Sequence, residues 1–240
     1  MNRGSFKFGD LTSESINAVI TQWPEIPIPE RKILINDSPI GIDRALLFDR
    51  NAYENRKFEL IIAIRGNNRQ ENLDKLITTL STGRYVDAVF YFDPNYTYQI
   101  TLTDVVDVKR PLIMSEYREY GLKFSAAPYK YFNDVPDINI GTDSVTIVNP
   151  TAYNALPYIK LIGSGNINLK INGINYSFTG VQGLIELDSS LQNVWRTDGV
   201  TLINENAKMS RSKFPILNSG TNTISISTGT GIIKPKWRSL

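Results

Sequence analysis

Acidic side chains are the first candidates for chemistry in this chain. Two pairs of carboxylates lie close in sequence, Asp104 with Asp107 and Glu186 with Asp188. Paired carboxylates act as acid and base in glycoside hydrolases, and residues two apart in a strand share one face. Sequence spacing does not place either pair across a cleft, and most Asp and Glu side chains are exposed to solvent. We therefore assign no catalytic residue.

Three further aspartates, Asp134, Asp137 and Asp143, raise the possibility of a calcium site. Calcium loops space their ligands as Asp-x-Asp-x-Asp-Gly, and this segment does not. We therefore assign no metal ligand.

Two glycine-containing segments resemble ligand-binding loops in part. Gly163-Ser-Gly165 lacks the surrounding residues of a phosphate loop or a nucleophile elbow, and it is interpreted as a β-turn. Gly229-Thr-Gly231 precedes no predicted helix, which a dinucleotide-binding loop requires. The sequence therefore predicts neither a cofactor nor a cofactor-binding residue.

Aromatic side chains could stack on a sugar, as they do in lectins. The candidates are Tyr153, Tyr158, Tyr176 and Trp195. Trp195 lies just before an expected Asp198-Gly199 turn, where it can equally cap a core or cover a domain edge. Packing in the core is the favoured interpretation.

Composition excludes whole classes of chemistry. The 240 residues include no Cys and no His, which rules out disulfides, thiolate nucleophiles, Cys/His zinc sites and Ser-His-Asp triads. An enzyme would have to use carboxylates, Lys, Tyr or a hard metal ion.

Charge and hydropathy do not indicate a nucleic-acid or membrane partner. The net charge is +2, from 26 basic and 24 acidic residues, which is too small to mark either kind of binder. The N-terminus lacks the apolar core of a secretory signal. The most apolar stretch, 58–64, contains Glu59 and is far shorter than the ~20 residues that span a bilayer. We therefore expect no membrane insertion.

The first half of the chain is expected to be rich in strands, with one helix. Phe58, Leu60, Ile62 and Ile64 alternate along a strand at 56–64. Three prolines exclude a helix at 23–29 and favour an extended arm that can bind a neighbouring molecule. Other strands are expected at 5–8, 18–21, 32–35, 86–92, 96–103, 105–110 and 116–126.

The expected helix covers 69–81. Leu73, Leu76, Ile77 and Leu80 recur at helical spacing, which predicts one buried face. Asn68 and Glu71 resemble a capping box, and Gly83 stands where a helix would end.

The composition changes after a polar, proline-broken segment at 129–141, which is interpreted as a linker. We therefore predict two domains, 1–138 and 139–240. The second contains short strands rich in Asn, Ser, Thr, Gly and Ile, including 184–187 and 223–227. Apolar residues alternate over 167–171 and 174–178 around Asn172-Gly173, which is typical of a type I′ hairpin. Strands of this kind indicate an antiparallel β-sandwich.

An ordered set of motifs in the second half resembles the distal tail protein (Dit) family of long-tailed, siphovirus-type bacteriophages. The set comprises 157–165, 171–173, 186–189, 214–217, 220–224 and 233–237. The first half is similar in its aromatic start, Phe6-Lys-Phe8, its long strand and its single helix. It departs from the family at 40–45, which lacks a Gly-Arg-Asp-Gly-like turn.

The resemblance implies a fold and a role. The fold would be mainly β, with an N-terminal belt domain that carries one helix and a C-terminal galectin-like antiparallel β-sandwich. The role would be that of a non-enzymatic structural hub of the tail tip or baseplate, at the distal end of the virion's tail after assembly in the host cytoplasm. A carbohydrate-binding module that acts in host adsorption is the alternative.

The resemblance also implies partners. Six copies would form a ring, a homo-hexamer, through which the genomic DNA passes. The ring would join the tail-tube protein to the tail-associated lysin or fibre protein and to receptor-binding proteins. A ring needs two complementary faces on each subunit and no catalytic group.

Overall fold

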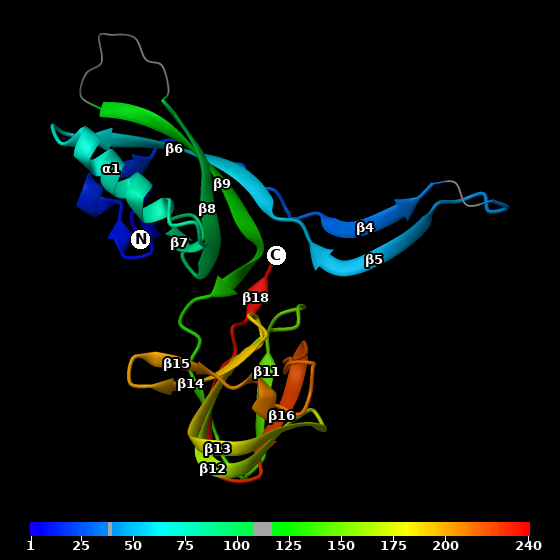
Figure 1. The fold of residues 1–240 in the computed structure, drawn as a ribbon. Coiled ribbons are helices and arrows are strands. Elements are labelled where there is room, and N and C mark those ends of the chain that lie inside the picture. Colours follow the sequence, from blue (N-terminus) through cyan, green and yellow to red (C-terminus); the bar gives the residue numbers. More distant parts are fainter. Residues whose placement is uncertain (38–39, 108–116) are drawn as a thin grey trace. The chain divides into compact units, whose positions relative to one another are not determined.

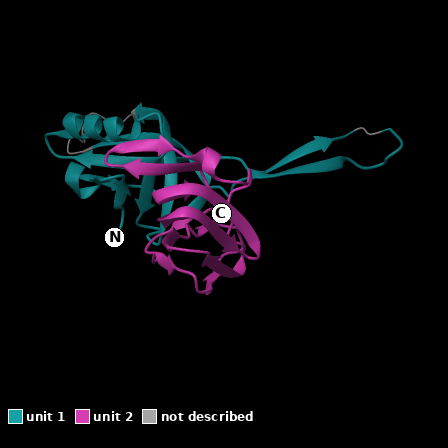
Figure 2. Ribbon diagram, turned by 60° about the horizontal axis from the view of Figure 1, so that its bottom comes forward, with its two compact units in different colours: residues 1–130, 240 teal, residues 131–239 magenta. Residues whose placement is uncertain are grey.

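The computed structural model describes residues 1–37, 40–107 and 117–240, and it divides the chain into two compact units (Figures 1 and 2). Unit 1 comprises residues 1–130 and Leu240, and unit 2 comprises residues 131–239. Most residues lie in antiparallel strands, which confirms the predicted mainly β class. The boundary between the two units falls at 130/131, whereas the sequence analysis placed the domain boundary at 138/139. Independent folding of the two units stays a prediction.

Unit 1 is an antiparallel sheet with a helix packed on its core. Its main sheet has the order β2-β1-β7-β8-β9-β6-β3, and β4 and β5 form a separate two-stranded hairpin. The strands are β1 (Phe6–Phe8), β2 (Leu11–Thr12), β3 (Ala18–Ile20), β4 (Arg31–Asn36), β5 (Leu46–Tyr53), β6 (Arg56–Arg65), β7 (Val86–Phe90), β8 (Tyr96–Asp107) and β9 (Tyr117–Phe132). A short 3-10 turn, η1 (Glu14–Ile16), precedes β3.

The core of unit 1 is aromatic at its centre. Phe58, Leu60, Ile62 and Ile64 of β6 are buried, as their alternation predicted. Phe90 is fully buried, and its ring lies 6.0 Å from Phe8 and 6.2 Å from Phe58 between centroids. Edge-to-face rings of this kind add stability beyond the area that they bury.

Helix α1 (Arg69–Leu80) confirms the predicted helix. Leu73, Leu76 and Leu80 are buried and Ile77 is partly buried against the same core, so the expected face packs inward. The predicted capping box is wrong. Asn68 forms no side-chain capping bond, and Glu71 instead pairs with Lys75 one turn later, at 2.8 Å.

Two predicted breaks in the chain are wrong. The strands expected at 96–103 and 105–110 are one continuous strand as far as Asp107, and 108–116 lies outside the described residues. The expected linker at 129–141 is largely strand, because β9 continues to Phe132 and β10 begins at Ile138. Only 133–137 lies between them without strand structure.

Unit 2 is built around one long, bent hairpin. Strand β12 (Tyr158–Ile171) pairs with β13 (Ile174–Asp188) through the predicted turn, where Asn172 and Gly173 both have positive φ. A bulge between Gly165 and Ile167 divides β12, so that its first part pairs with β17 and its last part with β16. The other strands are β10 (Ile138–Ile140), β11 (Val145–Asn149), β14 (Asn193–Asp198), β15 (Thr201–Asn204), β16 (Gly220–Ile226), β17 (Thr230–Lys234) and β18 (Arg238–Ser239).

The strands of unit 2 enclose a second apolar core. Ile159, Leu161 and Ile167 of β12 are fully buried, together with Ile185 and Leu187 of β13. After β17, Trp237 packs against the same core and its carbonyl accepts a hydrogen bond from the Phe132 N–H, at 3.0 Å. Among the described residues, no helix is long and apolar enough to cross a bilayer.

Residues 131–240, expressed alone, should fold and unfold cooperatively. Their core and their long hairpin are complete without unit 1, and two tryptophans, Trp195 and Trp237, report on unfolding by fluorescence. A fragment that shows no cooperative thermal transition would contradict the proposed independence of this unit.

Candidate functional site

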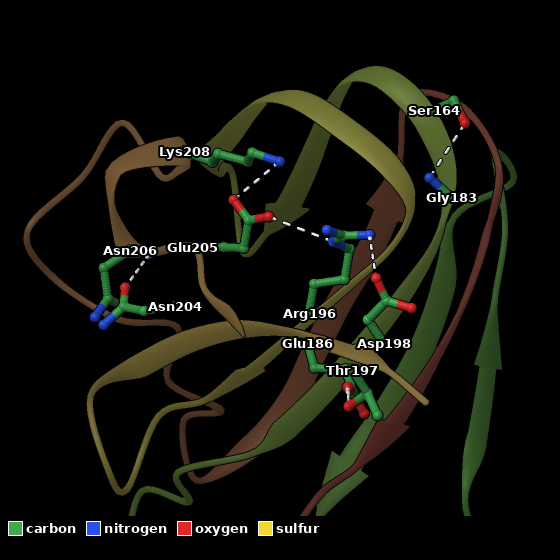
Figure 3. Close-up of polar contacts among 10 residues, drawn as sticks. All are labelled: Ser164, Gly183, Glu186, Arg196, Thr197, Asp198, Asn204, Glu205, Asn206 and Lys208. Atoms are coloured by element: carbon green, nitrogen blue, oxygen red, sulfur yellow. Dashed lines mark hydrogen bonds and ion pairs between the residues drawn. The ribbon is translucent and has the colours of Figure 1, made fainter. Parts of the chain in front are cut away.

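The strongest polar cluster of unit 2 surrounds the predicted carboxylate pair, Glu186 and Asp188. Both lie in β13, and both are buried. Tyr158 and Thr197 each donate a hydrogen bond to Glu186, and Figure 3 shows the contact with Thr197. Lys236 Nζ lies 2.6 Å from Asp188, and Ser190 donates to the same carboxylate through its backbone and its hydroxyl. The expectation that these two acids are solvated is wrong.

The electrostatics of this cluster favour charged carboxylates. Burial opposes ionisation of Glu186, but hydrogen bonds from Thr197 and Tyr158 outweigh it and hold its pKa below the usual value. Burial likewise opposes ionisation of Asp188, yet Lys236 and Ser190 lower its pKa. Burial, followed by the bond to Glu186, raises the pKa of Tyr158. A general acid needs a raised carboxyl pKa, so this geometry favours a structural role.

Acid should destabilise unit 2 through these carboxylates. A group whose folded-state pKa is depressed stabilises the protein above its unfolded pKa, which is about 3.9 for Asp and 4.3 for Glu. That contribution is lost as the pH falls through the lower, folded-state pKa. The melting temperature of 131–240 should therefore fall steeply below about pH 4. Asp188→Asn should melt lower at pH 7 and show a shallower acid dependence, and an unchanged acid slope would contradict this assignment.

A second polar cluster fixes the β14–β15 hairpin. Arg196 lies between Glu205 and Asp198, with nitrogen–oxygen distances of 3.5 and 3.6 Å (Figure 3). Lys208 Nζ lies 2.9 Å from the same Glu205. These contacts connect β14 with the residues that follow β15. They are ion pairs of the kind that stabilise a fold.

The aromatic candidates do not form a row on one face. Tyr176 is buried in the core, as favoured, whereas Trp195 is half-buried beside Tyr158, with 6.0 Å between ring centroids. Trp195 stands opposite Glu186 on the next strand, so it does not belong to the core. Tyr153 is half-buried, and its carbonyl accepts bonds from Asn149 and Thr151.

The remaining candidates are scattered. Asp104 pairs with Lys123 at 3.0 Å, and the side chain of Asp107 lies outside the described residues. Asp137 lies 3.9 Å from Lys234, while Asp134 and Asp143 are exposed. In the part of the chain that the structure describes, no group of acidic residues is arranged to hold a metal ion.

The two glycine motifs serve the sheet of unit 2, one inside a strand and the other at the turn that precedes β17. The turn expected at 163–165 is wrong, because these residues belong to β12 at its bulge and pair with β13. Ser164 accepts a hydrogen bond from the Gly183 N–H at 3.3 Å (Figure 3). Gly229 has positive φ, and a Cβ there would lie 2.3 Å from the Ile162 carbonyl oxygen. Glycine is needed there for close approach of two backbones.

The most conspicuous surface of unit 1 is the β4–β5 hairpin, which extends away from the main sheet of that unit (Figure 1). Leu34 and Phe48 are cross-strand partners, and each is more than half exposed, at 52% and 54%. Ile35 and Leu47 form the next pair and are also exposed. Isolated two-stranded hairpins are marginally stable in water, and exposed apolar patches mark interaction sites. This hairpin is therefore the best candidate for a functional surface.

The proline-broken arm leads directly into this hairpin. Pro24 and Pro29 are buried and Ile26 packs against the core of unit 1, so the arm lies partly on its own unit. Trp23 remains 70% exposed although its ring contacts Tyr91 and Phe92. The sequence identified the arm and β4 as extended, but it missed β5, in which Asp49, Arg50 and Asn51 interrupt the apolar pattern.

These features define a two-unit, mostly antiparallel β protein with the fold of the distal tail (Dit) proteins, which confirms the resemblance seen in the sequence. Two solved structures share that fold over nearly the whole chain. The Dit protein of phage SPP1, described as a paradigm of the hub adsorption apparatus in phages that infect Gram-positive bacteria, has a TM-score of 0.69 and 12% identity. The match covers 95% of this chain and 96% of that one.

The second structure is a chain of the phage p2 baseplate in its activated conformation. It has a TM-score of 0.54 and 10% identity, and the match covers 96% of this chain and 97% of that one. No family model and no curated protein sequence matches the chain. At these identities the likeness concerns the fold, and the role of this protein is a separate question.

Proposed function

We propose that this protein is a non-enzymatic structural hub of a phage tail tip, at the distal end of the tail. The main support for this proposal is the similarity of fold to the SPP1 hub protein. That similarity extends over both units and leaves little of either chain unmatched. A match to one unit alone would support a shared domain, whereas a match of both in the same order supports a shared architecture. Unit 2 would be the galectin-like domain, and the virion would be assembled in the host cytoplasm.

The proposed assembly is a hexameric ring made by the N-terminal domain. Its six copies would connect the tail-tube protein to the tail-associated lysin or fibre protein and to receptor-binding proteins, and DNA would pass through the centre. The exposed apolar hairpin supports this assembly because Leu34, Leu47 and Phe48 need a partner surface to leave water. The absence of Cys and His is no handicap to such a role.

Mass measurement tests the ring. At concentrations well above micromolar, the full chain should give the mass of six copies in light scattering or native mass spectrometry, and 131–240 should give the mass of one. A full chain that stays monomeric, or a 131–240 fragment that assembles alone, would contradict the proposal. Electron microscopy of the hexamer should show a closed ring.

One observation favours the alternative, a carbohydrate-binding role. An open depression on unit 2 is lined by Tyr158, Lys160, Ile232 and Lys234, together with Asp137 and Lys236. Sugars bind to an aromatic ring with polar neighbours in such places. Glycan binding by a monomeric 131–240 fragment, lost in Lys160→Ala, would favour this role, whereas the hub requires no such binding.

A further inference from the structure

A depression on unit 1 combines an exposed aromatic ring with two acids. It is lined by Gln22, Trp23, Pro24, Glu25, Glu59 and Ile61, and we call it the Trp23 depression. Trp23 is held from behind, because its ring centroid lies 5.8 Å from that of Tyr91 and 5.4 Å from that of Phe92. A ring that is fixed by its neighbours and still 70% exposed is suited to receive a partner side chain.

The two carboxylates of the Trp23 depression have no partner among the described residues. Glu59 stands opposite Lys123 in the register of β6 and β9, but Lys123 Nζ binds Asp104 instead, at 3.0 Å. Glu25 and Glu59 are exposed and form no ion pair or hydrogen bond within the described chain. The depression thus presents an apolar ring flanked by unbalanced negative charge, which favours a cationic partner.

The proximal part of the β4–β5 hairpin has the complementary character. Leu34 on β4 is the cross-strand partner of Phe48 on β5, and Arg50 follows Phe48 by two residues, at the point where the register of the two strands shifts. Arg50 is exposed and has no partner among the described residues. We call Leu34, Phe48 and Arg50 the hairpin face.

Charges elsewhere on the hairpin do not offset this face. Arg31 is already bound to Asp49, and Lys32 Nζ lies 3.4 Å from Glu54, so these charges balance one another. Asp37, Asp43 and Arg44 belong to the distal part of the hairpin, beyond the paired residues Asn36 and Leu46. Arg50 is therefore an unbalanced, exposed cation near the exposed apolar pair Leu34 and Phe48 in the proximal part of the hairpin.

We infer that the hairpin face of one copy docks on the Trp23 depression of a second copy, with Arg50 against the Trp23 ring and between Glu25 and Glu59. In this contact an apolar surface meets an apolar surface, and a cation meets two anions. The hairpin face and the Trp23 depression are both exposed in a single chain. The two surfaces differ, so the contact is head to tail, and each copy can use both at once. Head-to-tail contacts close into rings, whereas identical patches give two-fold dimers. This inference rests on the proposed ring and names the two faces that would form it.

A charge exchange between the two surfaces tests the pairing in the full-length chain. Arg50→Glu alone and Glu59→Arg alone should each raise the concentration at which half of the protein is assembled by about tenfold or more, because each places like charges together. The double variant R50E/E59R should restore assembly to within about threefold of wild type, because the attraction is rebuilt with opposite polarity. Lys7→Glu, at an exposed lysine in β1, carries the same change of charge elsewhere on unit 1 and should assemble like wild type.

The outcomes separate this pairing from the ring itself. If the wild type assembles and the single variants assemble equally well, the pairing is overturned and the ring is left in place. The same holds if the wild type assembles but the double variant assembles no better than either single variant. Circular dichroism and melting temperature of each variant show whether a lost assembly reflects misfolding, and a double variant that regains assembly excludes that cause. A wild-type chain that stays monomeric throughout overturns the proposed ring and this contact with it.

Discussion

The double variant Leu34→Asp/Phe48→Asp should convert the assembled protein into monomers. These two side chains are cross-strand partners on the β4–β5 hairpin and are about half exposed in the single chain. Full burial of an exposed Leu or Phe side chain contributes about 1.5–3 kcal/mol, and about half of that remains to be gained by each of these two residues, so losing both weakens each contact by about 1.5–3 kcal/mol before the cost of burying two carboxylates is added. With 1.4 kcal/mol for each factor of ten, the lost burial alone corresponds to about 10- to 10²-fold weaker association.

Sedimentation velocity of the full chain at several concentrations measures this effect. Val148→Asp provides a matched control, because Val148 is an apolar residue of unit 2 that is 63% exposed and lies outside the hairpin. The control should assemble like wild type, and both variants should retain the wild-type melting temperature of the monomer. If the double variant forms hexamers at the same concentration as the wild type, this hairpin does not form the contact between copies.

Regular periodicity made part of this fold predictable. The alternation in β6, the helical spacing of Leu73, Leu76 and Leu80, and the Asn172-Gly173 turn each specify one local structure strongly. In these segments burial and backbone preference agree, so local sequence is sufficient. The resemblance to distal tail proteins added the fold of the whole chain, which local patterns do not give.

Long bent strands were harder to recognise, because their interruptions resemble breaks. Asp104 suggested a gap in what is continuous β8, and Gly163 and Gly165 suggested a turn where β12 contains a bulge. Glycine inside a strand is itself a sign of a bulge, so that error was avoidable. Pro128 lies within β9, next to the segment that was taken for a linker.

The functional surfaces depend on contacts that no local pattern encodes. Lys236 meets Asp188 across 48 positions of sequence, and their pairing explains why that acid is buried. Leu34 and Phe48 look like ordinary core residues in sequence, since exposure is decided by where the rest of the chain lies. A surface recognised by its exposure therefore needs the three-dimensional structure.

Phe90→Ala should destabilise the folded chain by about 3–5 kcal/mol, the usual cost of deleting a buried aromatic side chain. Phe90 is fully buried in β7, and its ring contacts those of Phe8, Phe58 and Tyr98. Its removal leaves a cavity whose walls come from several strands, and a sheet held by many hydrogen bonds collapses around such a cavity incompletely.

Phe48→Ala is the matched control for this substitution, because the same side chain is deleted at a position that is 54% exposed. Urea unfolding below the concentration at which copies assemble should show less than about 1 kcal/mol of destabilisation for Phe48→Ala and several times more for Phe90→Ala. Above that concentration Phe48→Ala should weaken assembly more than Phe90→Ala does, since Phe48 is proposed to contact a neighbouring copy and Phe90 stabilises the unit itself. Equal destabilisation of the monomer by both variants would mean that the hairpin packs within its own chain, and it would remove the reason for assigning it to an interface.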